Sequence, residues 1–126
     1  MFEDDHVFAY LHEDWSVLGH AVVVWKSHVQ NLSDLTPTEL IQCMSAFQRI
    51  EISLLRAAKA ERAVILKLGV MVPHLHLHIY PVSGSADRKE VMAAIDGQSQ
   101  PEFNPLERQD FRQRLQSLFQ ASSSMP

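Results

Sequence analysis

Apolar positions that alternate or repeat with helical spacing divide most of the chain into strands and helices. Residues 6–11 and the valine-rich residues 20–25 have the composition of β-strands, and we expect them to form an antiparallel hairpin. The segment Thr36–Glu39 combines an N-cap, a proline at the first helical position and a glutamate at the third, which predicts a helix start. An apolar stripe continues this helix to about residue 60, and residues 63–68 should return as a strand.

The C-terminal third predicts further helix. Residues 85–95 favour a short helix that Gly97 stops, and residues 98–104 favour a loop. The segment Asn104–Glu107 repeats the helix-start chemistry, and spaced apolar residues give the helix that follows an apolar face through about residue 120. The serine-rich residues 122–126 are expected to be disordered.

Three of the seven histidines alternate with large apolar residues in the segment 73–81, PHLHLHIYP. Successive side chains of a strand point to opposite faces, so we expect the apolar residues to face the core and His74, His76 and His78 to share the other face. Imidazoles about 6.6 Å apart along a strand present several groups that titrate near neutrality to one ligand. This row predicts an active site.

Two other interpretations of the histidine row stay open. A histidine on a strand is usually a surface or hydrogen-bonded core residue, but three at period two with apolar partners are hard to obtain by accident. A metal site is the second alternative, yet His74 and His78 should lie about 13 Å apart along a strand, too far for shared ligation at Zn–N distances of about 2.1 Å. Neither an acidic residue nor a cysteine lies nearby in the sequence. We therefore expect no metal and no other cofactor, and keep metal-dependent hydrolysis as an alternative.

The composition is that of a compact cytoplasmic enzyme. At 126 residues the chain suits a single domain, residues 1–126, and its 46% hydrophobic content supplies a core. The net charge of −4 argues against binding to long nucleic acids, whereas small phosphorylated ligands stay compatible with it. The one cysteine, Cys43, cannot form an internal disulfide and is expected to be buried in a helix. The chain shows no basic start and no apolar run longer than a strand, so we expect neither export nor a membrane span.

The histidine row resembles the signature of the histidine triad (HIT) superfamily, His-φ-His-φ-His-φ-φ with φ apolar, at every position from His74 to Tyr80. Phe2–Tyr10 is similar to the first strand of that family with its acidic lead-in, and Gly19–His28 to its Gly-His, apolar strand and Lys-x-His segment. The resemblance implies an α+β fold with an antiparallel sheet of about five strands and one long helix. The triad-containing core would span about residues 2–82, a helical C-terminal extension would span about residues 83–121, and the protein would be a homodimer.

The chemistry that this resemblance implies is attack on the α-phosphate of a nucleotide conjugate, either a phosphoramidate or a dinucleoside polyphosphate. His76 would be the nucleophile that forms a covalent nucleotidyl-histidine, with its second ring nitrogen facing the backbone carbonyl of His74. His78 would contact the leaving oxygen, and His20 would pack beside the triad. The protein would then be a hydrolase or nucleotidyl transferase, and the alternative is a nucleotide-binding protein of the same fold with little turnover. Interacting imidazoles should titrate as one coupled set.

The resemblance also gives candidate substrate contacts. Tyr10 and Val22 align with positions that line the nucleobase pocket of the family, and Trp15 is a candidate to cover a base by stacking. Arg108 and Arg112 share one face of the predicted C-terminal helix, which we interpret as a solvated face.

Two departures from the family pattern bear on substrate binding. The chain has His12 where the family commonly places an acidic residue that grips the ribose hydroxyls, although Glu13 and Asp14 follow immediately as candidates. The segment 69–73, GVMVP, precedes the triad without a side-chain donor for phosphate, where the family commonly has a polar loop. We therefore expect a small nucleotide substrate that is held weakly, mainly by the triad, backbone groups and apolar contacts.

Overall fold

The computed structural model describes residues 1–12, 17–96 and 103–123, with side chains up to residue 120. These residues form five strands, three α-helices and a short 3₁₀-helix, Leu32–Asp34. In chain order the principal elements are β1 (Phe2–Glu3), β2 (Val7–Leu11), β3 (Ala21–Trp25), α1 (Pro37–Ala58), β4 (Arg62–Leu66), β5 (His76–Val82), α2 (Arg88–Ile95) and α3 (Pro105–Ser123). No helix in this described part is long and apolar enough to cross a membrane.

The five strands form one sheet in the order β1-β2-β3-β5-β4, and every neighbouring pair is antiparallel. The predicted hairpin of β2 and β3 is present, with a register that runs from Val7 opposite Trp25 to Leu11 opposite Ala21. The strand β5 lies between β3 and β4, so side chains from β3 and β4 flank it on both sides. The α+β fold that the sequence predicts, with one long helix and a helical C-terminal extension, is confirmed.

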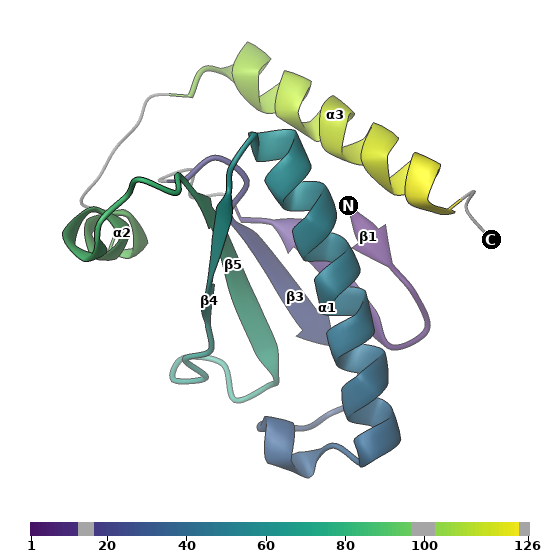
Figure 1. The fold of residues 1–126 in the computed structure, drawn as a ribbon. Helices are drawn as coiled ribbons and strands as arrows, with labels where there is room; N and C mark the ends of the chain where they lie inside the picture. Colours follow the sequence, from purple (N-terminus) through teal and green to yellow (C-terminus); the bar gives the residue numbers. More distant parts are fainter. Residues whose placement is uncertain (13–16, 97–102, 124–126) are drawn as a thin grey trace.

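Two helices cover one face of this sheet, as Figure 1 shows. The long helix α1 lies against the strands, and α3 packs beside α1. The core between them is apolar, since the inward-facing residues of β2, β3 and β5 meet one face of each helix. Its largest fully buried members are Ile50, Leu54, Leu75, Ile79, Phe111 and Leu115. Neither α1 nor α3 covers the opposite face of the sheet (Figure 1), so side chains on that face are available to form a site.

The helix α1 begins as the sequence predicts. The hydroxyl of Thr36 accepts a hydrogen bond from the backbone N–H of Glu39 at 3.2 Å, and the Glu39 carboxylate accepts one from the Thr36 N–H at 2.9 Å. The helix ends at Lys59, whose φ of 54° is left-handed. The thiol of Cys43 is buried in its apolar face, as expected, and burial raises the pKa of this thiol.

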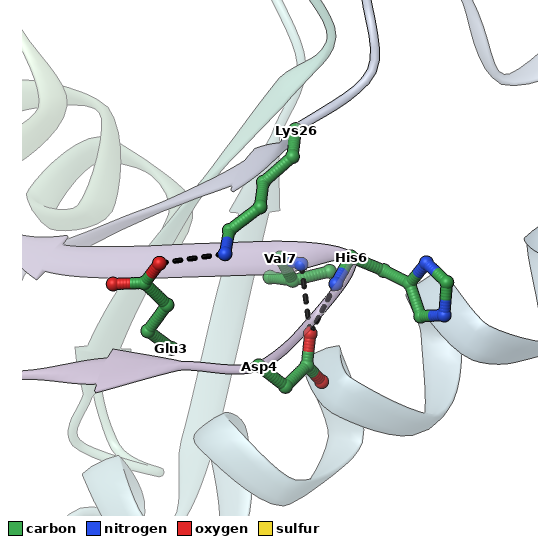
Figure 2. Close-up of polar contacts among 5 residues, drawn as sticks. All are labelled: Glu3, Asp4, His6, Val7 and Lys26. Carbon is green, nitrogen blue, oxygen red and sulfur yellow. Dashed lines mark hydrogen bonds and ion pairs between the residues drawn. The ribbon is translucent and has the colours of Figure 1, made fainter.

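A polar turn holds β1 beside β2 (Figure 2). One carboxylate oxygen of Asp4 accepts hydrogen bonds from the backbone N–H groups of His6 and Val7, both at 2.8 Å. The ammonium group of Lys26, which follows β3, contacts the Glu3 carboxylate of β1 at 2.6 Å. These contacts join the end of β1, the start of β2 and the end of β3, and fix the register in which β2 presents its side chains.

Several element boundaries differ from the predicted ones. The strand β4 covers Arg62–Leu66 instead of 63–68, and α2 begins after Asp87, whose carboxylate caps Glu90 at 2.8 Å. The expectation of disorder is wrong for residues 122–123, which continue α3 because helix propagation does not require an apolar side chain at each position. Gly97, residues 98–102 and residues 124–126 lie outside the described residues.

Candidate active site

The register of the sheet brings histidines and aromatic residues into rows on the face away from α1. His76 pairs with Val24 of β3, and Val24 pairs with Phe8 of β2. In the next row of the same face, His78 pairs with Val22, and Val22 pairs with Tyr10. Paired residues of a sheet share a face, so the two imidazoles stand beside each other and the two aromatic rings stand two strands away. The ring centroids of His76 and His78 are 5.3 Å apart.

A backbone carbonyl fixes the tautomer of His76. Its Nδ1 lies 2.7 Å from the carbonyl oxygen of His74, and a carbonyl only accepts, so Nδ1 carries the proton. The lone pair of the neutral ring is therefore left on Nε2. This is the contact that the family resemblance leads us to expect, and it makes Nε2 of His76 the nitrogen able to attack an electrophile.

His78 is held by His20, which comes from the turn before β3. The Nδ1 atom of His78 lies 2.9 Å from Nε2 of His20, and this contact leaves Nε2 of His78 for a ligand. Burial is the first cause that lowers the pKa of His78, followed by the positive charges that His76 and His12 would carry. The neutral form of His78 therefore predominates at neutral pH.

Two further rings stack on His20, the residue that holds His78. The ring of His20 is almost fully buried and lies 4.0 Å from the ring of Tyr80, at an interplanar angle of 18°. The ring of His12 stacks on His20 at 4.6 Å, and the His12 N–H donates to the His20 carbonyl at 2.9 Å. His20 is thus confined between two rings while it contacts a third.

The helix α3 also takes part in placing His20. The residue before it, Gly19, has a φ of +86°, which L side chains rarely adopt. A Cβ at Gly19 would stand 2.7 Å from the ring of Phe111, the fully buried aromatic residue of α3. The turn that carries His20 therefore depends on glycine for two independent reasons.

The first histidine of the predicted row does not join the other two. β5 begins at His76, so the expectation that His74 shares a strand face with His76 and His78 is wrong. The Leu75 N–H bonds to the carbonyl of Val29, and Nε2 of His74 donates to the Trp25 carbonyl at 2.6 Å. These contacts tie the chain to the end of β3 before ladder pairing begins. His74 contributes its carbonyl, and not its imidazole, to the pair of rings.

The candidate substrate contacts differ in how far their side chains are exposed to a ligand. The ring of Tyr10 is exposed on the triad face, beside the ring of Phe8 at 6.3 Å. Val22 lies between Tyr10 and His78 in its row but is only 1% exposed, so it forms a floor with little surface for a ligand. Glu13, Asp14 and Trp15 lie outside the described residues.

The loop before β5 has the apolar character that the sequence indicates. The side chains of Val70 and Met71 are 80% and 92% exposed, and neither can donate a hydrogen bond to phosphate. In the described ranges, no three histidine, cysteine, aspartate or glutamate side chains form a group able to hold a metal ion.

Three residues that the structure places on this face were not predicted from the sequence as members of the site. Tyr80 follows His78 by two positions and Phe8 precedes Tyr10 by two, so strict continuation of the strand period was a signal for both. His12 has no such signal, because its contact with His20 depends on the register of β2 against β3.

An antiparallel sheet that carries neighbouring triad histidines on its open face, with a Gly-His turn beside them, defines a HIT-fold protein. The HIT domain model matches residues 1–84, and the chain belongs to the HIT family. The protein named hit from Bacillus subtilis (strain 168) is 31% identical over 96 residues, which are 69% of this chain and 63% of that protein. This chain therefore spans less than two thirds of the length of that relative.

Solved structures show the same fold. A histidine triad protein from Bradyrhizobium japonicum superposes with a TM-score of 0.75 at 20% identity, over 91% of this chain and 85% of that one. A hypothetical histidine triad nucleotide-binding protein from Sulfolobus tokodaii gives a TM-score of 0.65 at 20% identity, over 93% and 83% of the two chains. At these identities the likeness is one of fold.

Proposed function

We propose that this protein is a hydrolase or nucleotidyl transferase that acts on the α-phosphate of nucleotide conjugates, such as phosphoramidates or dinucleoside polyphosphates. Membership of the HIT family supports the class, and the description of the Sulfolobus tokodaii structure as nucleotide-binding supports the ligand. The observation that carries the assignment is the contact of 2.7 Å between Nδ1 of His76 and the His74 carbonyl, which leaves the His76 lone pair on Nε2.

The first step forms a bond between Nε2 of His76 and phosphorus while the bond from phosphorus to the leaving oxygen or nitrogen breaks. His78, whose Nδ1 faces His20, donates a hydrogen bond from Nε2 to that leaving atom, which then takes up a proton from solvent. Burial lowers the pKa of His78, so this ring is neutral at neutral pH and donates from Nε2 as an uncharged imidazole. The product of this step is a nucleotidyl-His76 and a free leaving group.

The second step breaks the bond between phosphorus and His76. Water supplies the new oxygen on phosphorus and releases one proton, which gives a nucleoside monophosphate and restores neutral His76. A hydroxyl or phosphate acceptor in place of water would make the same enzyme a nucleotidyl transferase. The stack of His12, His20 and Tyr80 holds His78 in one orientation through both steps.

A nucleotide-binding protein with little turnover is the second candidate function. The apolar loop before β5 favours it, because Val70 and Met71 offer no side-chain donor to the phosphates of a conjugate. Both candidates bind a nucleotide, but only the first breaks the bond between the α-phosphorus and the leaving atom.

An assay of the purified protein against nucleotide conjugates separates the two candidates. The panel holds adenosine and guanosine phosphoramidates, dinucleoside polyphosphates and nucleotide sugars. We expect turnover of at least one class, and an increase in intact protein mass by one nucleotidyl group when the reaction is stopped under neutral denaturing conditions. Saturable nucleotide binding without turnover of any conjugate would establish the second candidate.

The variant His76→Ala tests the nucleophile. We expect its turnover to fall by several orders of magnitude, with no nucleotidyl adduct, because the residue that forms the covalent bond is absent. The matched control is His6→Ala, which removes an imidazole that stacks on Trp25 at 5.6 Å, outside the histidine pairs of β5. Turnover by His76→Ala at the rate of His6→Ala would show that the nucleophile is wrongly assigned.

We also propose that the protein is a homodimer, as the family resemblance implies. The strand β4 is an outer strand of the sheet, and no strand in the described ranges pairs with its outer edge. Ile65 on this strand is 49% exposed, and an uncovered edge of this kind readily pairs with another chain. Sedimentation equilibrium should give twice the chain mass at micromolar concentration, and a monomer mass there would contradict the proposal.

A further inference from the structure

The C-terminal helix α3 closes a cavity at the outer edge of β2. The strand β1 pairs with β2 only at Phe8 and Ala9, so no strand of the described residues pairs with the following part of β2 on that side. The cavity there has a volume of about 250 Å³. Its walls come from the chain start, from β2 and from α3, and they are formed by Met1, Tyr10, Leu11, Arg112, Leu115 and Gln116.

A second hollow adjoins this cavity. It has a volume of about 490 Å³ and shares Met1, Tyr10 and Gln116 with the first, while Phe8 and Ala9 of β2 extend it along the strand. The rings of Phe8 and Tyr10 are exposed on the same face as His76 and His78 and lie nearly parallel, at an interplanar angle of 23°. Exposed aromatic rings of this kind stack on nucleobases of any type.

The distance from the triad to these rings fits a nucleotide. Tyr10 lies in the row of His78 with Val22 between them, so two strand spacings of about 4.8 Å each separate the two residues. This separation is comparable with the reach of a nucleoside monophosphate from its phosphorus to its base. The nearly buried Val22 forms a low floor between them, over which a ribose can lie.

Two polar side chains of α3 face this region together. Arg112 and Gln116 are four residues apart, so they occupy neighbouring turns on one side of the helix, and both are exposed. The guanidinium group presents several donors, and the amide presents both donors and an acceptor, which are the groups that read the edges of bases. The buried Leu115 anchors this part of α3 to the core.

We propose that α3 completes a nucleobase site, in which Arg112 and Gln116 hydrogen-bond to the edge of a base stacked on Phe8 and Tyr10. The inference rests on the proposed nucleotide ligand and assigns base discrimination to the C-terminal extension. It replaces the interpretation of Arg112 as a purely solvated residue, because that side chain lines the cavity. Catalysis stays with the β5 histidines, and α3 sets which conjugates reach them.

The test compares base discrimination in matched variants of the full chain. Calorimetric titration gives the Kd of AMP, GMP, CMP, UMP and ribose 5-phosphate for the wild type, Arg112→Gln and Gln116→Leu. The control for the amide is Gln113→Leu, an exposed position of α3 that lines the hollow on the α1 side, and the control for the charge is Arg88→Gln on α2.

We expect each site variant to weaken binding of the preferred nucleotide about tenfold, the loss of one hydrogen bond to a base. The four nucleotides should then differ less from one another in Kd than they do with the wild type. Binding of ribose 5-phosphate should stay unchanged, because that ligand has no base, and both controls should keep the wild-type ratios.

The outcomes distinguish this inference from the proposed catalysis. Wild-type protein that binds nucleotides without turning over conjugates would overturn the enzymatic proposal, while reduced base discrimination in Arg112→Gln and Gln116→Leu would still support the role of α3. Site variants that keep the wild-type ratios would overturn the role of α3 whatever the turnover. Equal wild-type affinity for ribose 5-phosphate and for all four nucleotides would also overturn it, because the base would then contribute nothing.

Discussion

At the scale of single residues, each of the two β5 imidazoles is oriented by a partner of its own. The His74 carbonyl fixes His76, and His20 fixes His78 from the turn before β3. Orientation by separate partners means that the two rings can keep different tautomers although they lie 5.3 Å apart. We therefore expect the removal of a partner to alter the pH dependence of the site as well as its activity.

The low pKa of His78 predicts how stability changes with acid. The neutral ring is favoured in the folded protein, whereas an unfolded chain protonates its histidines near pH 6.5, so below that pH the unfolded state binds more protons. The free energy of unfolding should therefore fall as the pH drops from about 6.5 toward the folded pKa of His78. Chemical denaturation between pH 5 and 8 measures this slope.

The variant His78→Gln isolates the contribution of this residue, because glutamine has no proton to gain. We expect the slope below about pH 6.5 to become shallower, while the variant His6→Ala should leave the contribution of His78 in place. An unchanged slope in His78→Gln would show that another group causes the acid sensitivity.

At the scale of elements, the sequence predicted the strands and helices that follow from a local pattern of residues. The hairpin of β2 and β3, the capped start of α1 and the apolar face of α3 all follow from residues near one another in the chain. The start of β5 did not follow, because the bonds that hold His74 and Leu75 outside the ladder come from the end of β3 and the segment after it. Long-range contacts of this kind leave no periodic signal.

In the candidate site, too, some features follow from a local sequence pattern and others depend on long-range contacts. The alternation along β5 was sufficient to predict that His76 and His78 stand together and face away from the core. The stack of His12 on His20 and the cavity between β2 and α3 depend on how separate elements meet, so a local pattern does not encode them. The roles of the site residues stay predictions.

The contact of α3 with the Gly19 turn gives a prediction for that element. Gly19→Ala places a Cβ against the Phe111 ring in a left-handed backbone, so we expect it to destabilise the fold by about 1–2 kcal/mol or more and to lower turnover by displacing His20. Thermal unfolding and the turnover assay measure the two effects. In the control Gly84→Ala the nearest neighbours of the added Cβ would be Glu61 atoms at 3.4–3.7 Å, and equal behaviour of both variants would contradict the proposed constraint.

At the scale of the whole molecule, the sheet separates folding from chemistry. One face is covered by α1 and α3 and holds the core, while the other carries the imidazoles and exposed rings. We expect activity without a metal ion, because no three histidine, cysteine, aspartate or glutamate side chains of the described residues form a group able to hold one. Turnover should survive exhaustive dialysis against a chelator. Loss of turnover that zinc restores, with one zinc per chain, would establish the metal-dependent alternative instead.

The open face also predicts weak discrimination between ribose and deoxyribose nucleotides. His12 stands where the family commonly has an acidic residue for the ribose hydroxyls, and the exposed Val70 and Met71 give no donor to phosphate. Each absent charge-assisted hydrogen bond is worth about 1.5–3 kcal/mol, so two weaken binding by roughly two to four orders of magnitude. We expect a nucleoside monophosphate to bind with a Kd in the micromolar to millimolar range.

Calorimetric titration with the ribose and deoxyribose forms of one nucleotide measures this discrimination. The two Kd values should agree within a few-fold, because His12 does not replace a carboxylate at the ribose. Tight binding with a strong preference for the ribose form would mean that another group grips the hydroxyls. The variants Glu13→Gln and Asp14→Asn would then identify it, since each keeps the size of its side chain and removes the negative charge that accepts from both hydroxyls.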